Sequence, residues 1–274
     1  MNNPVLWLEL RIRIRERKLW IVTCLYLLCL FVISAISISS AAQNGLDNNP
    51  ATTGMAIFGY GVFSLVGLLV ILGPLASAGA ISQEREQRTL PALLNTPMSP
   101  STIVAGKLVA AWAFVLWLAL LSLPFLALGV IWGAVDVGRM AGGLCLAIAA
   151  GLVSSAIAIG LSGYFRRSLT SYLATGAVMF LWIVVCPIFG VLLLTFTRTN
   201  GDPATLHPWI FHAFFYHHPL APLIYLMSST PSAGPNALPA SIVPFALAAW
   251  AVFTGLFFAI ACRGLRRSSA KRLL

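Results

Sequence analysis

Residues 55–81 read MAIFGYGVFSLVGLLVILGPLASAGAI and contain no charged side chain. A helix needs roughly 20 consecutive apolar residues to cross the hydrocarbon core of a bilayer. This stretch is therefore long enough to be a transmembrane span. Gly73 and Pro74 within it predict a kink or a local unwinding, because proline removes a backbone donor and clashes with the preceding turn.

Five further uncharged runs lie on either side of this one. The six together are Leu19–Ala42, Met55–Ile81, Leu108–Val135, Met140–Phe165, Leu169–Phe196 and Ala240–Cys262. Of the 274 residues, 59% are hydrophobic and 9% are charged, which is outside the range of ordinary soluble domains. We therefore expect an all-α membrane protein with six transmembrane helices, in which residues 1–274 form a single domain.

Lysine and arginine are divided unevenly between the two sets of connecting segments. One set carries fifteen of the 17, namely Arg11, Arg13, Arg15, Arg17, Lys18, Arg85, Arg88, Lys107, Arg166, Arg167, Arg263, Arg266, Arg267, Lys271 and Arg272, and the other carries Arg139 and Arg198. Basic residues are enriched in cytoplasmic loops. Since the number of spans is even, the sequence predicts a multi-pass protein of the plasma membrane with both termini in the cytosol. The first run is about twice as long as the apolar region of a cleaved signal peptide, so we expect it to be a transmembrane span.

The formal net charge of +10 would favour nucleic-acid binding in a soluble protein. Here the basic residues flank apolar runs, where they set topology beside anionic lipid headgroups. We therefore expect membrane lipid, and not nucleic acid, as a partner. The cysteines show no metal-ligand spacing and are expected to be small hydrophobic residues inside the spans: Cys24, Cys29, Cys145, Cys186 and Cys262.

The six runs contain no Asp, Glu, Lys, Arg or His. Ion-coupled transporters and pumps usually place such groups near the middle of the membrane. If this chain transports a substrate, we expect its energy to come from elsewhere. The alternative is a membrane scaffold or assembly protein that transports nothing.

The leader, residues 1–18, mixes apolar and basic residues directly before the first run. Trp7 suits the headgroup level of a bilayer, and the arginines suit anionic lipid. The leader therefore predicts an interfacial amphipathic helix. A simple charge cluster that orients the first span is the alternative.

The loop at residues 82–107 reads SQEREQRTLPALLNTPMSPSTIVAGK. Two acids and two arginines are followed by a short leucine patch, and Ser99 or Ser101 is a candidate N-cap for the next helix. This pattern predicts a short amphipathic helix between the second and third spans. Such a helix can dock into a groove of a partner protein, where its charges fix the register.

The same loop resembles the ABC type-2 permease family, in which this motif joins the second and third of six spans. The matching residues are Glu84, Arg85, Glu86, Gln87, Thr89, Leu90, Leu93, Leu94, Thr96, Pro97, Ser99, Ile103, Gly106 and Lys107. The leader is similar to the elbow helix of that family. Two positions depart from the family pattern: Arg88 stands where glycine is common, and Pro91 stands where an acid is often found.

The resemblance implies the transport subunit of an exporter that couples to a separate cytosolic ABC ATPase. Members of the family work as two permease chains with two ATPase subunits. The chain has no GxxxxGK[ST] phosphate loop of its own, so we expect no enzymatic activity and no cofactor in it, with ATP and magnesium bound by the ATPase. The implied residues for docking that ATPase are Glu84, Arg85, Glu86, Arg88, Thr89, Leu90, Leu93 and Leu94.

Small residues recur at every fourth position of the fourth run, as Gly143, Ala147, Gly151 and Ser155. Such a row lets another helix approach closely. It predicts either packing within the chain or a seam with a second permease chain, which could be identical or a paralogue. Gly160–Gly163 in the same run resembles the GxSG motif of rhomboid proteases, but the sixth run lacks the histidine base that those enzymes use. We therefore expect ordinary helix packing and capping there.

The segment at residues 198–239 holds all four histidines and a cluster of aromatic residues. The spacing of His207, His212, His217 and His218 does not form one ligand face of a helix. We therefore expect interfacial or re-entrant helices on the external side, as the resemblance also implies. A metal or haem site is the alternative.

Overall fold

The computed structural model describes residues 7, 9, 11, 17–43, 50–94, 98–132, 135–192, 215–227 and 241–270, with side-chain detail for all except 18, 41–43, 50–53, 92, 94 and 268–270. These described residues form helices and connecting turns and contain no strand. The long helices are α2 (Arg17–Gln43), α3 (Pro50–Ser77), α6 (Pro100–Leu121), α8 (Val137–Tyr164), α9 (Ser168–Phe180) and α13 (Ile242–Ala270). The shorter ones are α4 (Ser82–Glu86), α5 (Leu90–Leu94), α7 (Leu123–Ile131), the π-helix η1 (Leu181–Val185) and α12 (Ala221–Met227).

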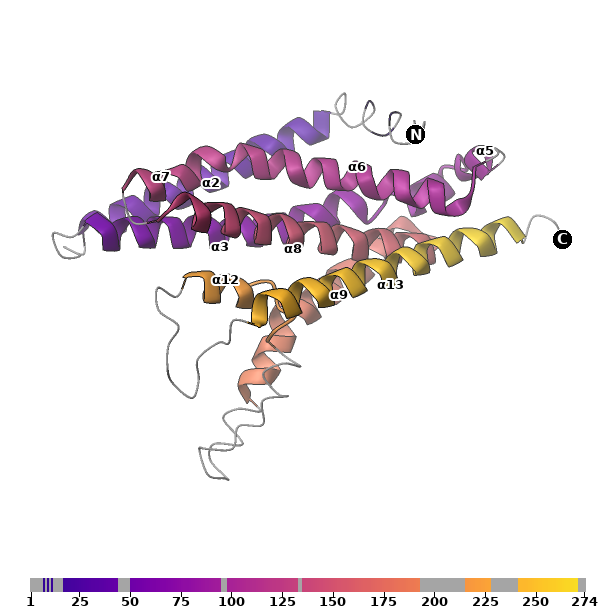
Figure 1. Cartoon of the computed structure of the whole chain (residues 1–274). Coiled ribbons are helices and arrows are strands. Elements are labelled where there is room, and N and C mark those ends of the chain that lie inside the picture. Colours follow the sequence, from indigo (N-terminus) through magenta and orange to yellow (C-terminus); the bar gives the residue numbers. More distant parts are fainter. Residues whose placement is uncertain are drawn as a thin grey trace, which may run out of the picture.

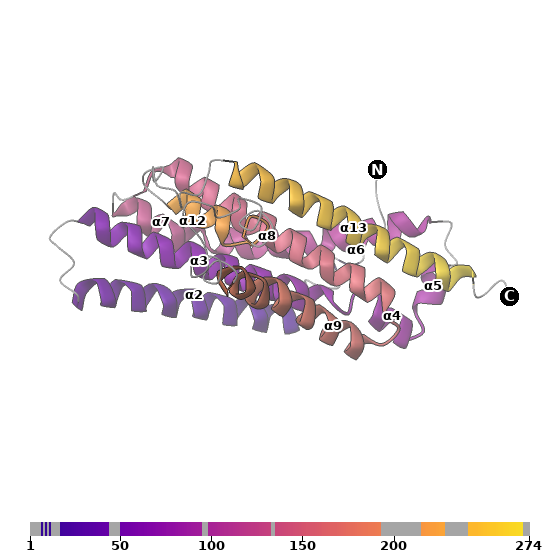
Figure 2. The same ribbon diagram turned by 90° about the horizontal axis from the view of Figure 1, so that it is seen from below.

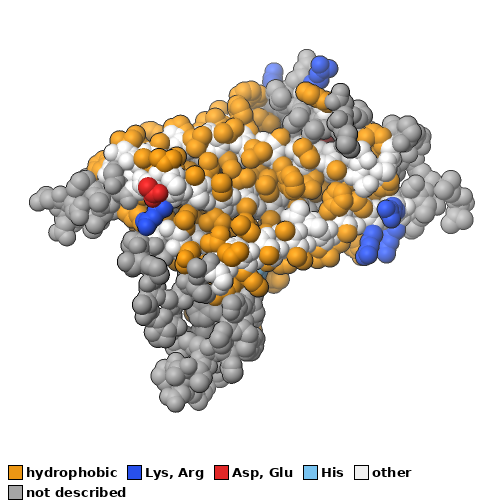
Figure 3. Space-filling view, in the orientation of Figure 1, with side chains coloured by type: hydrophobic (Ala, Val, Ile, Leu, Met, Phe, Trp, Pro, Cys, Tyr) orange, Lys and Arg blue, Asp and Glu red, His pale blue; other side chains and the backbone are white. Residues whose placement is uncertain are grey.

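Six helical stretches in the described residues are long and apolar enough to cross a membrane. They are Leu19–Ser40, Gly54–Glu86, Pro100–Ile131, Val137–Tyr164, Ser168–Leu192 and Ile242–Arg267. The predicted fold class, an all-α membrane protein with six spans, is confirmed. Figure 3 shows an apolar surface over the length of the bundle, with charged side chains gathered at its ends.

The fourth span, α8, forms the centre of the bundle. Of its most apolar stretch 67% is buried, against 17–44% in the other five spans. It packs against α3, α6, α9 and α13 (Figures 1 and 2), and its small residues let these helices approach. The Cβ that an alanine would add at Gly264 on α13 would overlap the backbone of Gly163 on α8, so these two helices touch backbone to backbone.

The third span departs from the prediction at both ends and in the middle. It begins at Pro100, eight residues before the predicted start, because the Ser99 hydroxyl accepts the amide of Thr102 and caps the helix. The span is interrupted at Ser122, between α6 and α7. Pro124 explains the break, since it has no N–H to donate to the preceding turn. The helix ends at Ile131, and Val135 is buried in the connection to α8.

Helix α3 of the second span continues through Pro74 and ends at Ser77. The amide of Ala78 donates to the Pro74 carbonyl at 2.8 Å, so regular hydrogen bonding resumes one turn after the proline. A turn over residues 78–81 then leads into α4. This turn places α4 at the same end of the bundle as α5 and the carboxyl end of α13 (Figure 2).

The fifth span slants away from the other long helices as it runs outward (Figure 1). Its regular α-helix changes at Leu181 into the single π-turn η1, in which the amide of Cys186 donates to the Leu181 carbonyl. Helical structure continues to Leu192. Residues 193–196, the predicted end of this span, lie outside the described residues.

Two predicted features fall largely outside the described part of the chain. Of the leader, residues 1–18, the structure describes Trp7, Glu9, Arg11, Arg17 and Lys18. Of the external segment, residues 198–239, it describes residues 215–227, which include the short helix α12.

Candidate functional site

The charged residues of α4 turn back onto the ends of neighbouring spans. Arg85 donates from Nη1 to the Phe165 carbonyl at 2.8 Å and from Nη2 to the Gly163 carbonyl at 3.2 Å. These carbonyls lie at the carboxyl end of α8, where the last turn of a helix has no amide partners of its own. Arg85 therefore caps α8 and joins it to α4.

Glu86 does the same for the amino end of α9. Its carboxylate accepts the Ser168 amide at 2.9 Å and the Ser168 hydroxyl. A carboxylate at this position is favoured both by the free amides and by the dipole of the helix. One turn of α4 is thus fastened to the fourth span through Arg85 and to the fifth span through Glu86.

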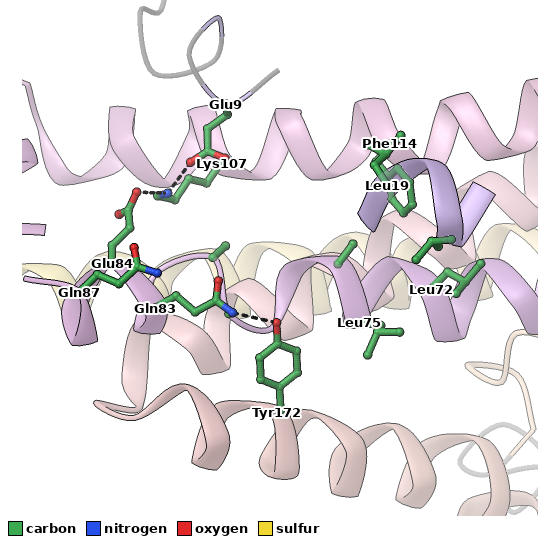
Figure 4. A pocket seen from close by; sticks show the side chains of 14 residues that line it. Glu9, Leu19, Leu72, Leu75, Gln83, Glu84, Gln87, Lys107, Phe114 and Tyr172 are labelled. Atoms are coloured by element: carbon green, nitrogen blue, oxygen red, sulfur yellow. Dashed lines mark hydrogen bonds and ion pairs between the residues drawn. The ribbon is translucent and has the colours of Figure 1, made fainter. Parts of the chain in front are cut away.

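Glu84 completes a third connection, through a lysine that is 2% exposed. Lys107 on α6 pairs with Glu84 at 2.7 Å and with Glu9 of the leader at 2.6 Å (Figure 4). Breaking a buried ion pair by removing one partner usually costs about 3–5 kcal/mol. The apolar pattern predicts that Lys107 lies in the loop, and this prediction is wrong. Lys107 lies two turns inside α6, where two carboxylates neutralise its charge.

A tight reversal separates α4 from α5. The amide of Thr89 donates to the Glu84 carbonyl at 2.9 Å and that of Arg88 to the Arg85 carbonyl at 3.3 Å, a pattern that ends many helices. Arg88 has a φ of 58°, in the left-handed region that favours glycine. The resemblance to the permease family puts glycine commonly at this position, and the backbone of Arg88 adopts a conformation that glycine favours.

The leucines of α5 pack inward. Leu90 is buried, at 3% exposed, against a cluster that includes Ile103 on α6 and Leu265 on α13, and Leu93 packs partly against the same cluster. The side chain of Leu94 lies outside the described residues. The exposed tip of the loop is formed by Gln87, Arg88 and Thr89.

Ser162 of the GxSG sequence supports this loop from within the bundle. Its hydroxyl oxygen accepts the amides of Ile81 and Ser82, each at 3.0 Å, at the start of α4. Ser162 is buried. Its role in the structure is to cap α4.

The row of small residues on α8 faces other helices of the same chain. A Cβ at Gly143 would lie 3.2 Å from Val62 on α3, and one at Gly151 would lie 2.8 Å from Val115 on α6. Ala147 and Ser155 in the same row are fully buried as well. The row is therefore occupied by α3 and α6 within the chain.

The two described histidines bind backbone beside the π-turn. The Leu220 amide donates to Nδ1 of His218 at 3.2 Å, which leaves Nε2 to donate to the Ile183 carbonyl at 3.1 Å. His217 lies 3.5 Å from the Cys186 sulfur. Burial is the main cause that lowers the pKa of both imidazoles. His207 and His212 lie outside the described residues.

Within the described part of the chain, no three His, Cys, Asp or Glu side chains come together as metal ligands would. The sequence pattern found α4 and its charged residues and predicted capping at Gly160–Gly163, but it did not find Glu9, the helix that Ser162 caps, Ser168 or the full role of Lys107. Lys107 is part of the family motif, and its charge at the edge of an apolar run was the available signal. The other three depend on contacts between distant segments.

The comparison with known families covers nearly the whole chain. The sequence profile described as "ABC-2 family transporter protein" matches residues 3–267. A search of curated proteins finds no match. The profile match agrees with the six apolar stretches of the described residues that are long enough to cross a membrane. The chain therefore belongs to the ABC-2 family of transporter proteins.

Proposed function

We propose that this chain is the permease subunit of an ABC exporter, and that a separate cytosolic ATPase subunit docks on the tip between α4 and α5. The observation that carries the proposal is the set of connections made by α4. Arg85 joins it to α8, Glu86 joins it to α9, and Glu84 joins it to α6 and the leader through Lys107.

These connections convert a force on one short helix into movement of several spans. When two ATPase subunits close around ATP and magnesium, they would displace the tips of α4 in two permease chains. The spans held by Arg85, Glu86 and Lys107 would then move as one body, and the pair of permease chains would switch between inward-facing and outward-facing states. Export, and not import, follows from the family resemblance.

The proposal gives the motif residues two different roles. Glu84, Arg85 and Glu86 are positioning residues, because their side chains contact this chain's own helices. Gln87, Arg88 and Thr89 are exposed at the tip and are assigned to contact the ATPase. Leu90 and Leu93 hold the tip against α6 and α13, since they pack into the cluster beneath it.

A pull-down from native membranes in mild detergent tests this assignment. A Gln87→Ala, Arg88→Glu double variant is expected to recover roughly tenfold less ATPase than the wild type, because it reverses the charge at the centre of the proposed contact. Arg267→Glu is the matched control, since Arg267 is an exposed arginine on α13.

Equal recovery with the double variant and the control would show that the ATPase docks elsewhere. If even the wild type recovers no ATPase, the alternative of a membrane scaffold without a transport cycle is favoured. If the two variants are expressed at the same level and only the control recovers ATPase, docking at the tip is supported.

A further inference from the structure

A cavity of about 440 Å³ opens beside Lys107 and its two carboxylate partners, Glu9 and Glu84, between α2, α3, α4, α6 and α9. Its volume lies within the range of about 300–1,000 Å³ that small-molecule sites occupy. Figure 4 shows that its polar and apolar residues are separated along its length. This separation indicates an amphipathic ligand, with a polar group at one end and an apolar chain at the other.

The polar end carries a net negative charge. Its charged residues in the described part of the chain are Glu9, Glu84 and Lys107, and the neutral groups beside them are Gln83, Gln87 and Tyr172. Lys107 is almost fully buried and donates to both carboxylates, so its positive charge is already neutralised. Among these three residues one negative charge therefore remains unbalanced, and it would repel an anionic ligand.

The same end offers hydrogen-bond acceptors. Oε2 of Glu84 is buried and has no partner among the described residues. A buried carboxylate oxygen without a donor is costly, so a ligand that donates to it is favoured. The Tyr172 hydroxyl, which accepts from Gln83 at 3.3 Å, lies on the opposite wall (Figure 4). A primary ammonium supplies both the charge and the N–H donors that this end requires.

The other end of the cavity is apolar. Leu19 on α2, Leu72 and Leu75 on α3 and Phe114 on α6 line it. Their side chains lie together on the side away from Glu84 (Figure 4). An alkyl chain that extends from the ammonium would be buried against these residues, and each methylene would contribute to binding through the hydrophobic effect.

We propose that this cavity binds a primary ammonium carried on an apolar chain. The ligand is either the headgroup of an aminophospholipid from the surrounding membrane or a free amphiphilic amine. The proposal goes beyond the assigned permease function and does not depend on ATPase docking. Because Gln83, Glu84 and Gln87 belong to α4 or its end, a bound ligand contacts the helix to which coupling is assigned.

Binding of tritiated dodecylamine to the chain in nanodiscs tests the proposal, with empty nanodiscs subtracted. Gln83 is exposed and is outside the ion cluster, so its substitution leaves the buried charges intact. Gln83→Glu is expected to tighten binding and Gln83→Lys to weaken it, each by roughly two- to fivefold, as expected for one partly exposed charge pair. Unlabelled dodecanoate, with the same chain and the opposite charge, should not compete.

Equal affinity of both Gln83 variants, or competition by dodecanoate as strong as by unlabelled dodecylamine, would overturn the proposal. A second variant, Leu75→Ser, tests the apolar end and should weaken binding of dodecylamine more than binding of hexylamine.

Nanodiscs of phosphatidylcholine and phosphatidylglycerol, with and without phosphatidylethanolamine, separate the two sources of the ammonium ligand. Lower dodecylamine affinity when phosphatidylethanolamine is present identifies the lipid headgroup as the occupant, and unchanged affinity identifies a free amine.

Discussion

Arg88 lowers the stability of the fold because its backbone conformation is strained. Its φ of 58° is unfavourable for a residue with a Cβ by about 1–2 kcal/mol. Glycine would remove that strain but would lose more conformational entropy on folding, by about 0.5–1 kcal/mol. We predict that Arg88→Gly raises the free energy of unfolding by about 0.5–1 kcal/mol, seen as a higher midpoint of thermal unfolding in detergent.

Arg88→Ala separates strain from charge. Alanine removes the guanidinium but keeps the Cβ, so it should leave the unfolding midpoint unchanged or lower it. If Arg88→Ala stabilises the chain as much as Arg88→Gly, repulsion between basic residues would be the cause, and the argument from φ would fail. An exposed arginine kept in a strained conformation fits the proposed role of the loop tip in binding the ATPase.

At the scale of elements, the spans could be predicted because each one carries its own apolar pattern. The interruption at Ser122 was not predicted, although Pro124 was the available signal for it. The contacts of Arg85 and Glu86 could not be predicted, because they are made with helix ends that only the tertiary fold brings near α4. The motif thus located the site, while the partners of its residues came from the packing of α8 and α9.

The π-turn in the fifth span gives a second prediction. His218 binds the Ile183 carbonyl inside η1, and burial, more than its neighbour His217, lowers the pKa of its imidazole below the ordinary value of 6.5. The neutral ring is therefore the folded form, so the stability that it contributes is present above pH 6.5 and is lost as the pH falls below it. We predict that the midpoint of thermal unfolding falls between pH 7.5 and pH 5.

His218→Gln tests whether this residue is responsible. Glutamine keeps a donor and an acceptor but does not titrate, so the fall in midpoint on acidification should be smaller than in the wild type. His217→Gln is the companion variant, since His217 is half-buried and lies beside the Cys186 sulfur. A variant at position 218 that loses as much stability on acidification as the wild type would show that other groups set the pH dependence.

At the scale of the whole molecule, most of the basic residues that the structure describes lie at the end of the bundle that carries α4 and α5. Leu90 of α5, Ile103 of α6 and Leu265 of α13 pack in one cluster there. The opposite end carries Asp136, paired at 3.7 Å with Arg139. The proposed transport cycle requires the first of these ends to face the cytosol, because that is where an ATPase finds ATP.

Cysteine labelling in sealed vesicles tests this orientation. Arg88→Cys is expected to react with a membrane-impermeant maleimide in inside-out vesicles only, and Asp136→Cys in right-side-out vesicles only. The two side chains lie at opposite ends of the bundle, and each is exposed. The wild type is the control, because its five cysteines lie within the apolar runs. The reverse pattern would place α4 outside the cell, where no cytosolic ATPase could reach it, and the proposed coupling would be excluded.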